Sequence, residues 1–522
     1  MKVMNPVLPG FNPDPSLVRV GDDYYIATST FEWFPGICIH HSKDLVNWEI
    51  LSYALTDETK FDIKGMDTAC GIWAPNLTYD NATFYLIYTI VYTNRNRFKD
   101  THNFMVTASD PKGPWSDPIP LNKMGFDPSL FHDPDGTKWL VNMLFDYRLD
   151  HKRFGGVGVQ QYDPETKKLV GPVYNVFKGS DKGTTEGPNI FYHDGWYYLV
   201  TAEGGTEFKH CVTMCRSEKL TGPYEISPYV PVLTSFGKDV QLKRAGHGQI
   251  IQGKDGNWYM AHLCSRSLDN CSITGRETAI QNMLYTDDSW FKLSANDTAS
   301  PEDFFEVPGE VEVKPEKSGF TDFGKITEIP LEYMTLRQSA KTCGISISEG
   351  KLHIQGGNSL ASKYNQGLLA RRHQHHSYDF TAKMEFTPGD YCHMAGIVCY
   401  YNYDNNYYLH MSVDDEGKTY VMLNVSVNKE ITQSEKVYLQ ENGKPVYLKA
   451  EVRECDVTFF VSQDGISYTQ VGDVLDMRNL SDERVDGNGF TGAMVGVSCQ
   501  DLHGDGVQAD FDWVDYKVFK PL

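Results

Sequence analysis

Three acidic residues occupy matching places along the chain and are the first candidates for chemistry. Asp14 lies in NPDPS, Asp127 in GFDPS and Glu186 in TTEGPN. A proline follows each aspartate directly and follows Glu186 after one glycine. Because proline restricts the residue before it, we expect Asp14 to be held in an extended conformation before tertiary contacts form. An ordinary surface turn is the alternative for any one such motif taken alone.

Carboxyl groups that meet in an aromatic cleft can hydrolyse a glycosidic bond. One carboxylic acid protonates the leaving oxygen, while a second carboxylate activates water or attacks the sugar directly. A third carboxylate raises the pKa of the acid through its negative charge. Acids carried by separate elements leave room for a water molecule between them, so we expect hydrolysis with inversion.

An internal repeat supplies the elements that bring these acids together. Five segments share one plan, an apolar run, a polar turn and an aromatic run, and they begin at Asp14, Ala74, Asp127, Gly187 and His247. Each reads as a β-hairpin, and each period has room for two further strands. Four strands in each of five repeats predict an all-β fold, a five-bladed β-propeller catalytic domain over residues 1–305. The residues that head the repeats, with Glu186 beside Gly187, then point into one central funnel.

The second half of the chain has a different pattern. Proline and glutamate cluster in SPEDFFEVPGEVEVKPEKSGF, which begins at Ser300, and we interpret residues 306–320 as a linker. Over residues 321–522, alternating runs such as YDFTAKMEF and TYVMLNVSV are separated by polar turns and predict a β-sandwich domain. A sandwich by itself would suggest a carbohydrate-binding module.

Composition narrows the class of partner. The net charge of −21 argues against nucleic acid and anionic membranes as main partners. Aromatic residues make up 13% of the chain, which suits neutral sugars, although strand propensity explains most of them. The eleven cysteines show no zinc-site spacing, and the N-terminus has no apolar signal region. We expect a cytoplasmic protein, or a periplasmic one if a signal peptide has been removed; a homo-oligomer stays open.

Several motifs, taken together and in order, resemble the family 43 glycoside hydrolases, in particular the two-domain β-xylosidase and α-L-arabinofuranosidase group. They are NPDPS, FEWFPG, HSKDLVNW, GIWAP, GFDPSLFHD, TEGP, TAEGGT and GRETAIQ. The resemblance covers most of the chain and implies an inverting propeller enzyme. Carried over by position, it makes Asp14 the general base and Glu186 the general acid. Asp127 would raise the pKa of the acid and orient it.

The same resemblance implies substrate-binding residues. Phe31 and Trp73 correspond to aromatic walls of the sugar pocket, with packing between blades as the alternative. Thr206 in TAEGGT is expected to line that pocket. Arg276 in GRETAIQ corresponds to a substrate-binding arginine; a structural ion pair with Glu277 or with a propeller acid is the alternative.

Two further positions bear on metal binding and on substrate choice. His247 corresponds to a histidine that in some relatives contacts calcium, directly or through water, although the chemistry itself requires no cofactor. A hydrogen-bonded core histidine is the alternative. Phe490 is a candidate lip residue at the mouth, where relatives often carry two phenylalanines and this chain has Gly489 before a single one. The short loop SLDNCSIT before GRETAIQ also slightly favours arabinofuranosidase activity.

These observations predict an inverting exo-acting glycosidase. It would release terminal α-L-arabinofuranosyl or β-D-xylosyl residues from arabinose- or xylose-containing oligosaccharides derived from plant hemicellulose. A non-catalytic sugar-binding propeller is one alternative, and the presence of a third acid argues against it. An endo-arabinanase is another, and a lip supplied by the sandwich argues against that.

Overall fold

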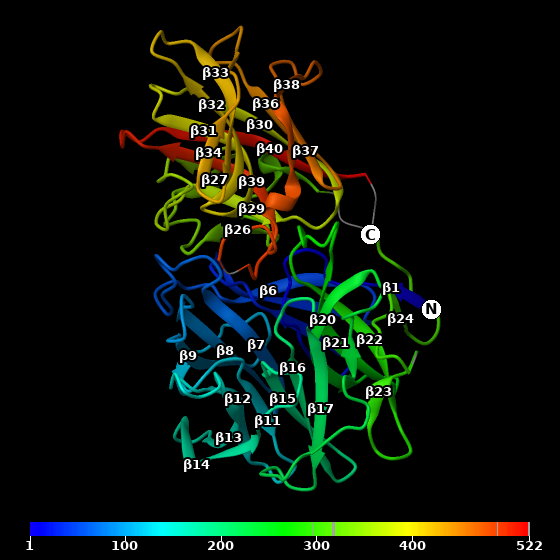
Figure 1. The fold of residues 1–522 in the computed structure, drawn as a ribbon. Helices are drawn as coiled ribbons and strands as arrows, with labels where there is room; N and C mark the ends of the chain where they lie inside the picture. Colours follow the sequence, from blue (N-terminus) through cyan, green and yellow to red (C-terminus); the bar gives the residue numbers. More distant parts are fainter. Residues whose placement is uncertain (296, 316–318, 488, 520–522) are drawn as a thin grey trace.

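Strands make up almost all of the regular structure. The computed structural model describes residues 1–295, 297–315, 319–487 and 489–519. Within these ranges the helical elements are two short 3-10 helices, η1 (Phe323–Lys325) and η2 (Met477–Leu480), and no helix has the length and apolarity to cross a bilayer. The chain forms a propeller and, above it in Figure 1, a sandwich. The predicted all-β fold class is confirmed.

Five antiparallel sheets form the blades, and their strands follow chain order except in the fourth, where the last two strands both pair with the third. The first contains β2 (Ser16–Val20), β3 (Asp23–Thr28), β5 (Gly36–Ser42) and β6 (Glu49–Leu55). The second contains β7 (Gly71–Asp80), β8 (Thr83–Thr93), β9 (Asp100–Ala108) and β10 (Ile119–Pro120). The third contains β11 (Ser129–His132), β12 (Lys138–Phe145), β13 (Phe154–Asp163) and β14 (Lys168–Phe177). The fourth contains β15 (Glu186–His193), β16 (Trp196–Glu203), β17 (Cys211–Ser217), β18 (Glu225–Ile226) and β19 (Leu233–Thr234). The fifth contains β20 (Leu242–Gln252), β21 (Trp258–Arg266), β22 (Glu277–Tyr285) and β23 (Phe291–Leu293).

A ring of hydrogen bonds joins neighbouring blades around the axis. In every blade the polar side chain two residues after the start of the repeat bonds to the backbone of the next blade, at 2.7 to 3.1 Å. The five side chains are Ser16, Asn76, Ser129, Asn189 and Gln249. The ring closes where Leu17 N–H donates to Gln249 Oε1, 2.9 Å away, from the first blade to the fifth. Each bond satisfies a backbone group that would otherwise be buried without a partner.

The residue that heads each repeat has a left-handed backbone. The φ angles are 55° at Asp14, 32° at Ala74, 51° at Asp127, 55° at Gly187 and 51° at His247. The expectation that proline holds Asp14 in an extended conformation is therefore wrong. The pairing register also shifts beside this position in three blades, as expected where a bulge re-aims a side chain. This local kink, imposed by the blade and repeated five times, turns the side chain towards the axis.

The N-terminal segment closes the propeller against its last blade. β1 (Lys2–Met4) pairs with β24 (Phe304–Glu306), and Leu8 forms a bridge with Thr278. Asn12 N–H donates to the carbonyl of Arg276 at 2.9 Å. This contact holds the backbone just before Asp14 against the strand entry that carries Arg276. Of the stretch interpreted as a linker, residues 316–318 lie outside the described residues.

Two antiparallel sheets form the sandwich. In order across the first sheet lie β27 (Ile345–Ser348), β28 (Lys351–Gln355), β40 (Gln508–Val518), β30 (Ser377–Phe386), β36 (Val446–Arg453), β37 (Asp456–Ser462) and β38 (Thr469–Asp476), with β25 (Phe320–Asp322) beside β40. In the second lie β34 (Glu430–Gln433), β33 (Thr419–Val427), β32 (Asn405–Val413), β31 (His393–Asn402), β39 (Met494–Asp501), β29 (Leu368–Arg372) and β26 (Tyr333–Leu336), with β35 (Val437–Tyr438) beside β33. The core between them is apolar and almost fully buried.

The second sheet continues into the propeller. Its outermost strand is β4 (Trp33–Phe34), from the loop between two strands of the first blade, and it pairs with β26. Trp33 is fully buried and meets Tyr400 of the sandwich edge to face, with the ring centroids 6.0 Å apart. One hydrophobic cluster runs from sandwich residues such as Tyr400 to Phe31 and Trp73 of the propeller. The FEWFPG motif therefore serves both the pocket and the junction between the domains.

Candidate active site

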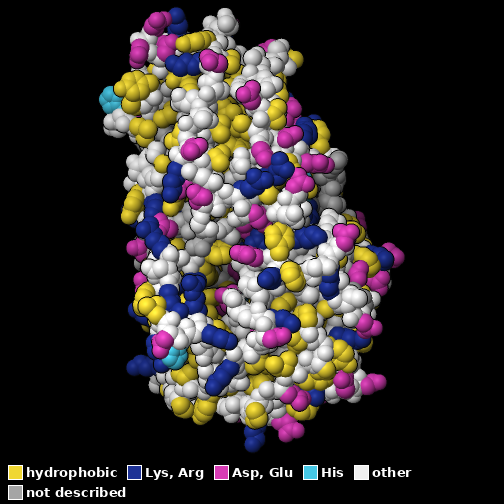
Figure 2. All heavy atoms as spheres, viewed as in Figure 1, with side chains coloured by type: hydrophobic (Ala, Val, Ile, Leu, Met, Phe, Trp, Pro, Cys, Tyr) yellow, Lys and Arg dark blue, Asp and Glu magenta, His cyan; other side chains and the backbone are white. Residues whose placement is uncertain are grey.

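A cavity of about 500 Å³ opens at the mouth of the propeller funnel, facing the sandwich. The residues predicted from the sequence that line it are Asp14, Phe31, Trp73, Asp127, Glu186, Thr206, His247, Arg276 and Phe490. They come from all five blades and from one loop of the sandwich. Although the chain is acidic overall, Lys and Arg side chains gather on the propeller below the sandwich, on the side where β9 lies (Figure 2).

Asp14 is held as a carboxylate. It is 5% exposed, and its two oxygens accept hydrogen bonds from Ser29 Oγ at 2.7 Å and from Arg276 at 3.0 Å. Burial acts to raise the pKa of Asp14, but Arg276, His247 and the Ser29 hydroxyl together outweigh it and lower the pKa below its usual value. An ionised, oriented carboxylate of this kind can accept a proton from water.

Glu186 and Asp127, in contrast, keep their protons up to a higher pH than ordinary carboxyl groups. Burial, with a contribution from the charge of Asp14, raises the pKa of Glu186 to about 7, against the lowering effect of Lys99. Burial and the neighbouring Glu186 and Asp14 also raise the pKa of Asp127. Asp127 accepts a hydrogen bond from the Gly187 N–H at 2.9 Å, which ties it to the residue after Glu186. A carboxyl group that keeps its proton near neutral pH can act as a general acid.

Arg276 joins the propeller acid to the sandwich. It is 4% exposed, and its Nη1 donates to Asp14 Oδ1 at 3.0 Å and to Thr206 Oγ1 at 3.3 Å. Its Nε and Nη2 both donate to the Phe490 carbonyl, at 3.0 and 2.8 Å. The ion pair with a propeller acid, weighed as an alternative to substrate binding, is present, whereas Glu277 pairs with Arg266 at 2.6 Å.

Aromatic rings wall the cavity on the side of the first and second blades. Phe31 and Trp73 lie 5.6 Å apart between centroids, and Trp73 meets Phe126 and Phe490 edge to face at 5.6 and 5.8 Å. Arg276 lies over the rings of Phe31 and Phe490, 5.2 and 5.8 Å from their centroids. Such a surface suits the apolar face of a sugar ring. Phe126 was not singled out from the sequence, although it directly precedes Asp127.

His247 belongs to no direct side-chain ligand group among the described residues, and the predicted contact with calcium through water stays a prediction. Its Nδ1 lies 3.8 Å from Asp14 Oδ1. Among the described residues, no group of three His, Cys, Asp or Glu ligand atoms that includes His247 lies within 4.8 Å of one another. Calcium takes six to eight oxygen ligands, waters included, so these side chains alone do not complete its coordination shell. The ring instead packs on Gly187, where an added Cβ would lie 3.0 Å from it.

Two further residues of the cavity could not be predicted from the repeat. Lys99 lies in the loop before β9, with its Nζ 5.3 Å from the Trp73 centroid, and burial lowers its pKa. His210 is 2% exposed and donates from Nδ1 to the Arg244 carbonyl at 3.1 Å. Burial lowers the pKa of His210 to about 3, so the ring is neutral. Neither residue occupies a repeat-equivalent position; His210 could have been suspected only as a polar residue just after TAEGGT, and Lys99 has no recognised motif nearby.

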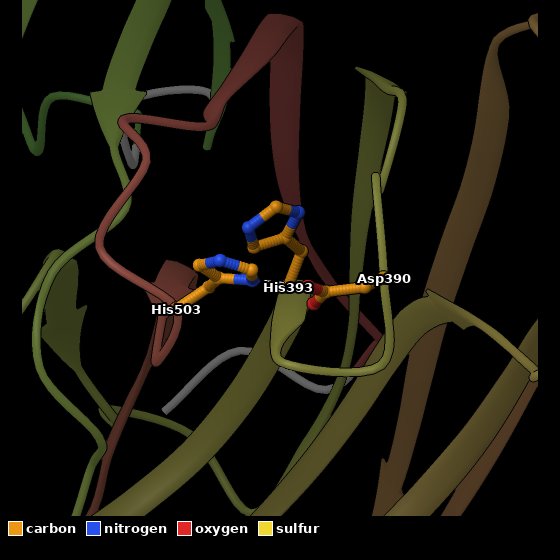
Figure 3. A group of neighbouring side chains, drawn as sticks. All are labelled: Asp390, His393 and His503. Atoms are coloured by element: carbon orange, nitrogen blue, oxygen red, sulfur yellow. Dashed lines mark hydrogen bonds and ion pairs between the residues drawn. The ribbon is translucent and has the colours of Figure 1, made fainter.

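A second titratable cluster lies in the sandwich, where Asp390, His393 and His503 turn towards one another (Figure 3). His393 Nδ1 accepts a hydrogen bond from Gly389 N–H at 2.9 Å. The neutral ring therefore carries its proton on Nε2, which lies 2.8 Å from a carboxylate oxygen of Asp505. A protonated nitrogen has no lone pair for a metal ion, so we assign no metal to this group.

An ionised carboxylate and a protonated carboxylic acid on different propeller blades, facing one aromatic-walled cavity, define a glycoside hydrolase. The sequence matches "Glycosyl hydrolases family 43" over residues 3–291 and "Beta xylosidase C-terminal Concanavalin A-like domain" over residues 321–517. The chain belongs to glycosyl hydrolase family 43.

Full-length relatives share both domains. The chain is 41% identical to "Xylosidase/arabinosidase 43B" of Humicola insolens, covering 100% of this chain and 98% of that one. It is 40% identical to "Xylan 1,3-beta-xylosidase" of a Vibrio species, covering 98% and 99%. The crystal structure of a xylan β-1,4-xylosidase from Bacillus halodurans superposes with a TM-score of 0.96 at 43% identity, covering 99% and 100%. The predicted family, fold and class of exo-acting, inverting glycosidase are confirmed, and hydrolysis in this family requires no cofactor.

Proposed function

We propose that the protein releases single terminal α-L-arabinofuranosyl or β-D-xylosyl residues, with Asp14 as general base and Glu186 as general acid. The observation that carries this proposal is the opposite shift of two pKa values in one cavity, lowered at Asp14 and raised at Glu186. The lip residue Phe490, supplied by the sandwich, limits the cavity on one side. A cavity bounded in this way favours a chain end or side branch over the middle of a polymer.

The chemistry follows from these protonation states. Asp14 accepts a proton from a water molecule whose oxygen attacks the anomeric carbon of the terminal sugar. Glu186 gives its proton to the leaving oxygen as the bond between that oxygen and the anomeric carbon breaks. Asp127 accepts a hydrogen bond from Gly187 N–H, and its negative charge, once it ionises, opposes the loss of the proton from Glu186. Proton exchange with solvent then restores Asp14 as the carboxylate and Glu186 as the acid.

The choice of sugars rests on the relatives. Their names include xylosidases and an enzyme named for both xylosidase and arabinosidase activity. A β-xylopyranosyl and an α-L-arabinofuranosyl group present similar hydroxyl arrangements, so one set of groups around Arg276 and Thr206 can accept both. The free state of all eleven cysteines is in keeping with a reducing compartment, which we propose for this protein.

The decisive experiment compares hydrolysis of 4-nitrophenyl β-D-xylopyranoside and 4-nitrophenyl α-L-arabinofuranoside. We expect release of 4-nitrophenol from at least one of them, and monosaccharide as the only small product from xylo- or arabino-oligosaccharides. Glu186→Gln should lose activity on the oligosaccharides, whose leaving groups need a proton, more than on the aryl glycosides.

Asp133→Asn is the matched control. Asp133 lies in the same blade as Asp127 and its pKa is also raised, chiefly by burial, but it is not among the residues that line the cavity. Unchanged activity of Glu186→Gln on oligosaccharides would remove Glu186 from its proposed role. Release of oligosaccharides instead of monosaccharide would contradict exo attack.

A further inference from the structure

A buried charge cluster crosses the junction of the two domains near the cavity. Arg244 of β20 donates from Nη1 to Asp482 Oδ2 at 2.9 Å and to Glu483 Oε1 at 3.1 Å. The side chains of Arg244 and Asp482 are 3% and 2% exposed. Glu483 also accepts hydrogen bonds from the N–H and hydroxyl of Ser272, at 2.7 and 2.8 Å. Removing one member of such a group leaves an uncompensated buried charge.

On the propeller side, hydrogen bonds connect this cluster to the proposed base, Asp14. Arg244 Nε donates to the carbonyl of Thr206 at 3.0 Å. The hydroxyl of the same Thr206 accepts from Arg276, which also donates to Asp14. Arg244 therefore fixes the backbone of a residue that Arg276 contacts.

On the sandwich side, the cluster contacts the loop that carries the lip residue Phe490. Asp482 Oδ1 accepts a hydrogen bond from the Tyr401 hydroxyl at 2.6 Å, so both of its oxygens are fixed. Gly489 packs directly on Asp482, and an added Cβ there would lie 2.4 Å from the Asp482 carbonyl oxygen. The next residue, Phe490, supplies the carbonyl that accepts two hydrogen bonds from Arg276. The single phenylalanine preceded by glycine is thus part of this packing.

The two domains also cross closely at the same place. A Cβ added to Gly275, the residue before Arg276, would lie 2.2 Å from the Thr491 carbonyl oxygen. A Cβ added to Gly492 would lie 2.8 Å from the Thr274 carbonyl oxygen. A shift of the sandwich loop would therefore move Arg276 through its backbone as well as its side chain.

We infer that Arg244 and Asp482 are positioning residues, through which the sandwich domain holds Arg276 and Phe490 in the arrangement that keeps Asp14 competent as a base. The inference rests on the proposed role of Asp14. Three of the hydrogen bonds of Arg276 end on Phe490 and Thr206, and these are the two residues that the cluster fixes. The sandwich is in this sense part of the catalytic apparatus without contributing a reacting group.

The test uses the full chain with Arg244→Met and Arg244→Lys. We expect Arg244→Met to lower kcat/KM by about 100-fold, as small misplacements of catalytic groups do. The acid limb of the pH profile should move to higher pH, because Arg276 lowers the pKa of Asp14 and would do so less effectively. Arg244→Lys keeps the charge opposite Asp482 but lacks the second arm that reaches Thr206, so it should show a smaller shift and test the idea even if Arg244→Met folds poorly.

Arg337→Met is the matched control. Arg337 is 2% exposed, crosses the junction to the Met66 carbonyl at 2.7 Å, and is not among the residues that line the cavity. It should lower the thermal unfolding midpoint without moving the acid limb. If Arg244→Met and Arg244→Lys lower only that midpoint and leave kcat/KM and the acid limb unchanged, the cluster is merely structural and the inference is overturned.

A readout without substrate separates this inference from the proposed function. The carboxyl carbon of Asp14, labelled with ¹³C and assigned by Asp14→Asn, can be titrated by NMR in the wild type and in both Arg244 variants. A higher Asp14 pKa in the variants supports the inference even if neither aryl glycoside is hydrolysed. An unchanged pKa and unchanged line position contradict it, whatever the activity assays show.

Discussion

Asp14 and Asp127 occupy equivalent places in two blades and yet are held in opposite states. Both head a repeat, both have a left-handed backbone, and they are 5% and 8% exposed. The pKa of Asp14 is lowered and that of Asp127 is raised. Their shared features come from the repeat, so the difference must come from contacts that the repeat does not contain.

Those contacts lie on different sides of the cavity. Asp14 faces Ser29 and Arg276, and Arg276 is itself held by the sandwich. Asp127 faces Glu186 and receives one backbone N–H, from Gly187. Position is thus set by the fivefold architecture around the axis, while charge is set by single contacts, and only those of Asp14 extend to the junction of the domains. The predictions below separate these two contributions.

The largest effect is expected from the pair of aspartates themselves. Asp14→Asn removes the proposed base and should lower kcat by about 10²- to 10⁴-fold on both aryl glycosides and oligosaccharides. Asp127→Asn keeps the base and should mainly lower the pKa that controls the basic limb, because it removes a carboxyl group whose charge, once Asp127 ionises, opposes the ionisation of Glu186. Rates and pH profiles of the two variants check this. Indistinguishable pH profiles would mean that the two aspartates share one role.

This contrast also explains which parts could be predicted from the sequence. The repeat is visible in the amino-acid sequence, so its spacing predicts the propeller and the convergence of Asp14, Asp127 and Glu186. The pairing of Trp33–Phe34 with Thr335–Leu336 joins segments about 300 residues apart and has no local signal. Arg244, Lys99 and His210 act through contacts that depend on the packed blades and sandwich. The left-handed φ of Asp14 escaped prediction because the blade geometry overrides the preference of a residue before proline.

A smaller effect is expected at the junction, from Gly489→Ala. The added methyl group would lie 2.4 Å from the Asp482 carbonyl oxygen, so the loop carrying Phe490 must shift. Overpacking of this kind costs about 1–3 kcal/mol, and here we expect it as a raised KM and a roughly 5- to 100-fold lower kcat/KM. Gly389→Ala is the control, since its methyl group meets only the His393 ring, at 3.3 Å. Equal kinetics for the two variants would show that the lip does not depend on this contact.

A substitution in the ring of hydrogen bonds around the axis should lower the stability of the fold but change kcat little. Gln249→Ala leaves the buried N–H of Leu17 without its partner at the closure of the ring, which costs about 1–3 kcal/mol. The thermal unfolding midpoint should fall, while kcat per folded molecule stays close to that of the wild type. Gln252→Ala, at the exposed end of the same strand, is the matched control and should leave the midpoint unchanged. A large fall in kcat for Gln249→Ala would mean that the axis does more than place the blades.

The smallest effect is expected from Lys99→Met, which changes charge and leaves the axis and the junction intact. Activity should fall as pH rises through about 7, where Glu186 loses its proton. Lys99 lowers the pKa of Glu186, so removing its charge should raise that pKa and move the basic limb of kcat/KM to higher pH. The acid limb, controlled by Asp14, should stay in place, because Lys99 is not among the groups that shift the pKa of Asp14. Lys123→Met, a change of charge outside the cavity, controls for net charge. If the basic limb of Lys99→Met stays at the same pH, burial and not Lys99 controls the pKa of Glu186. If both limbs shift, the charges of the acid and the base are not set by separate contacts.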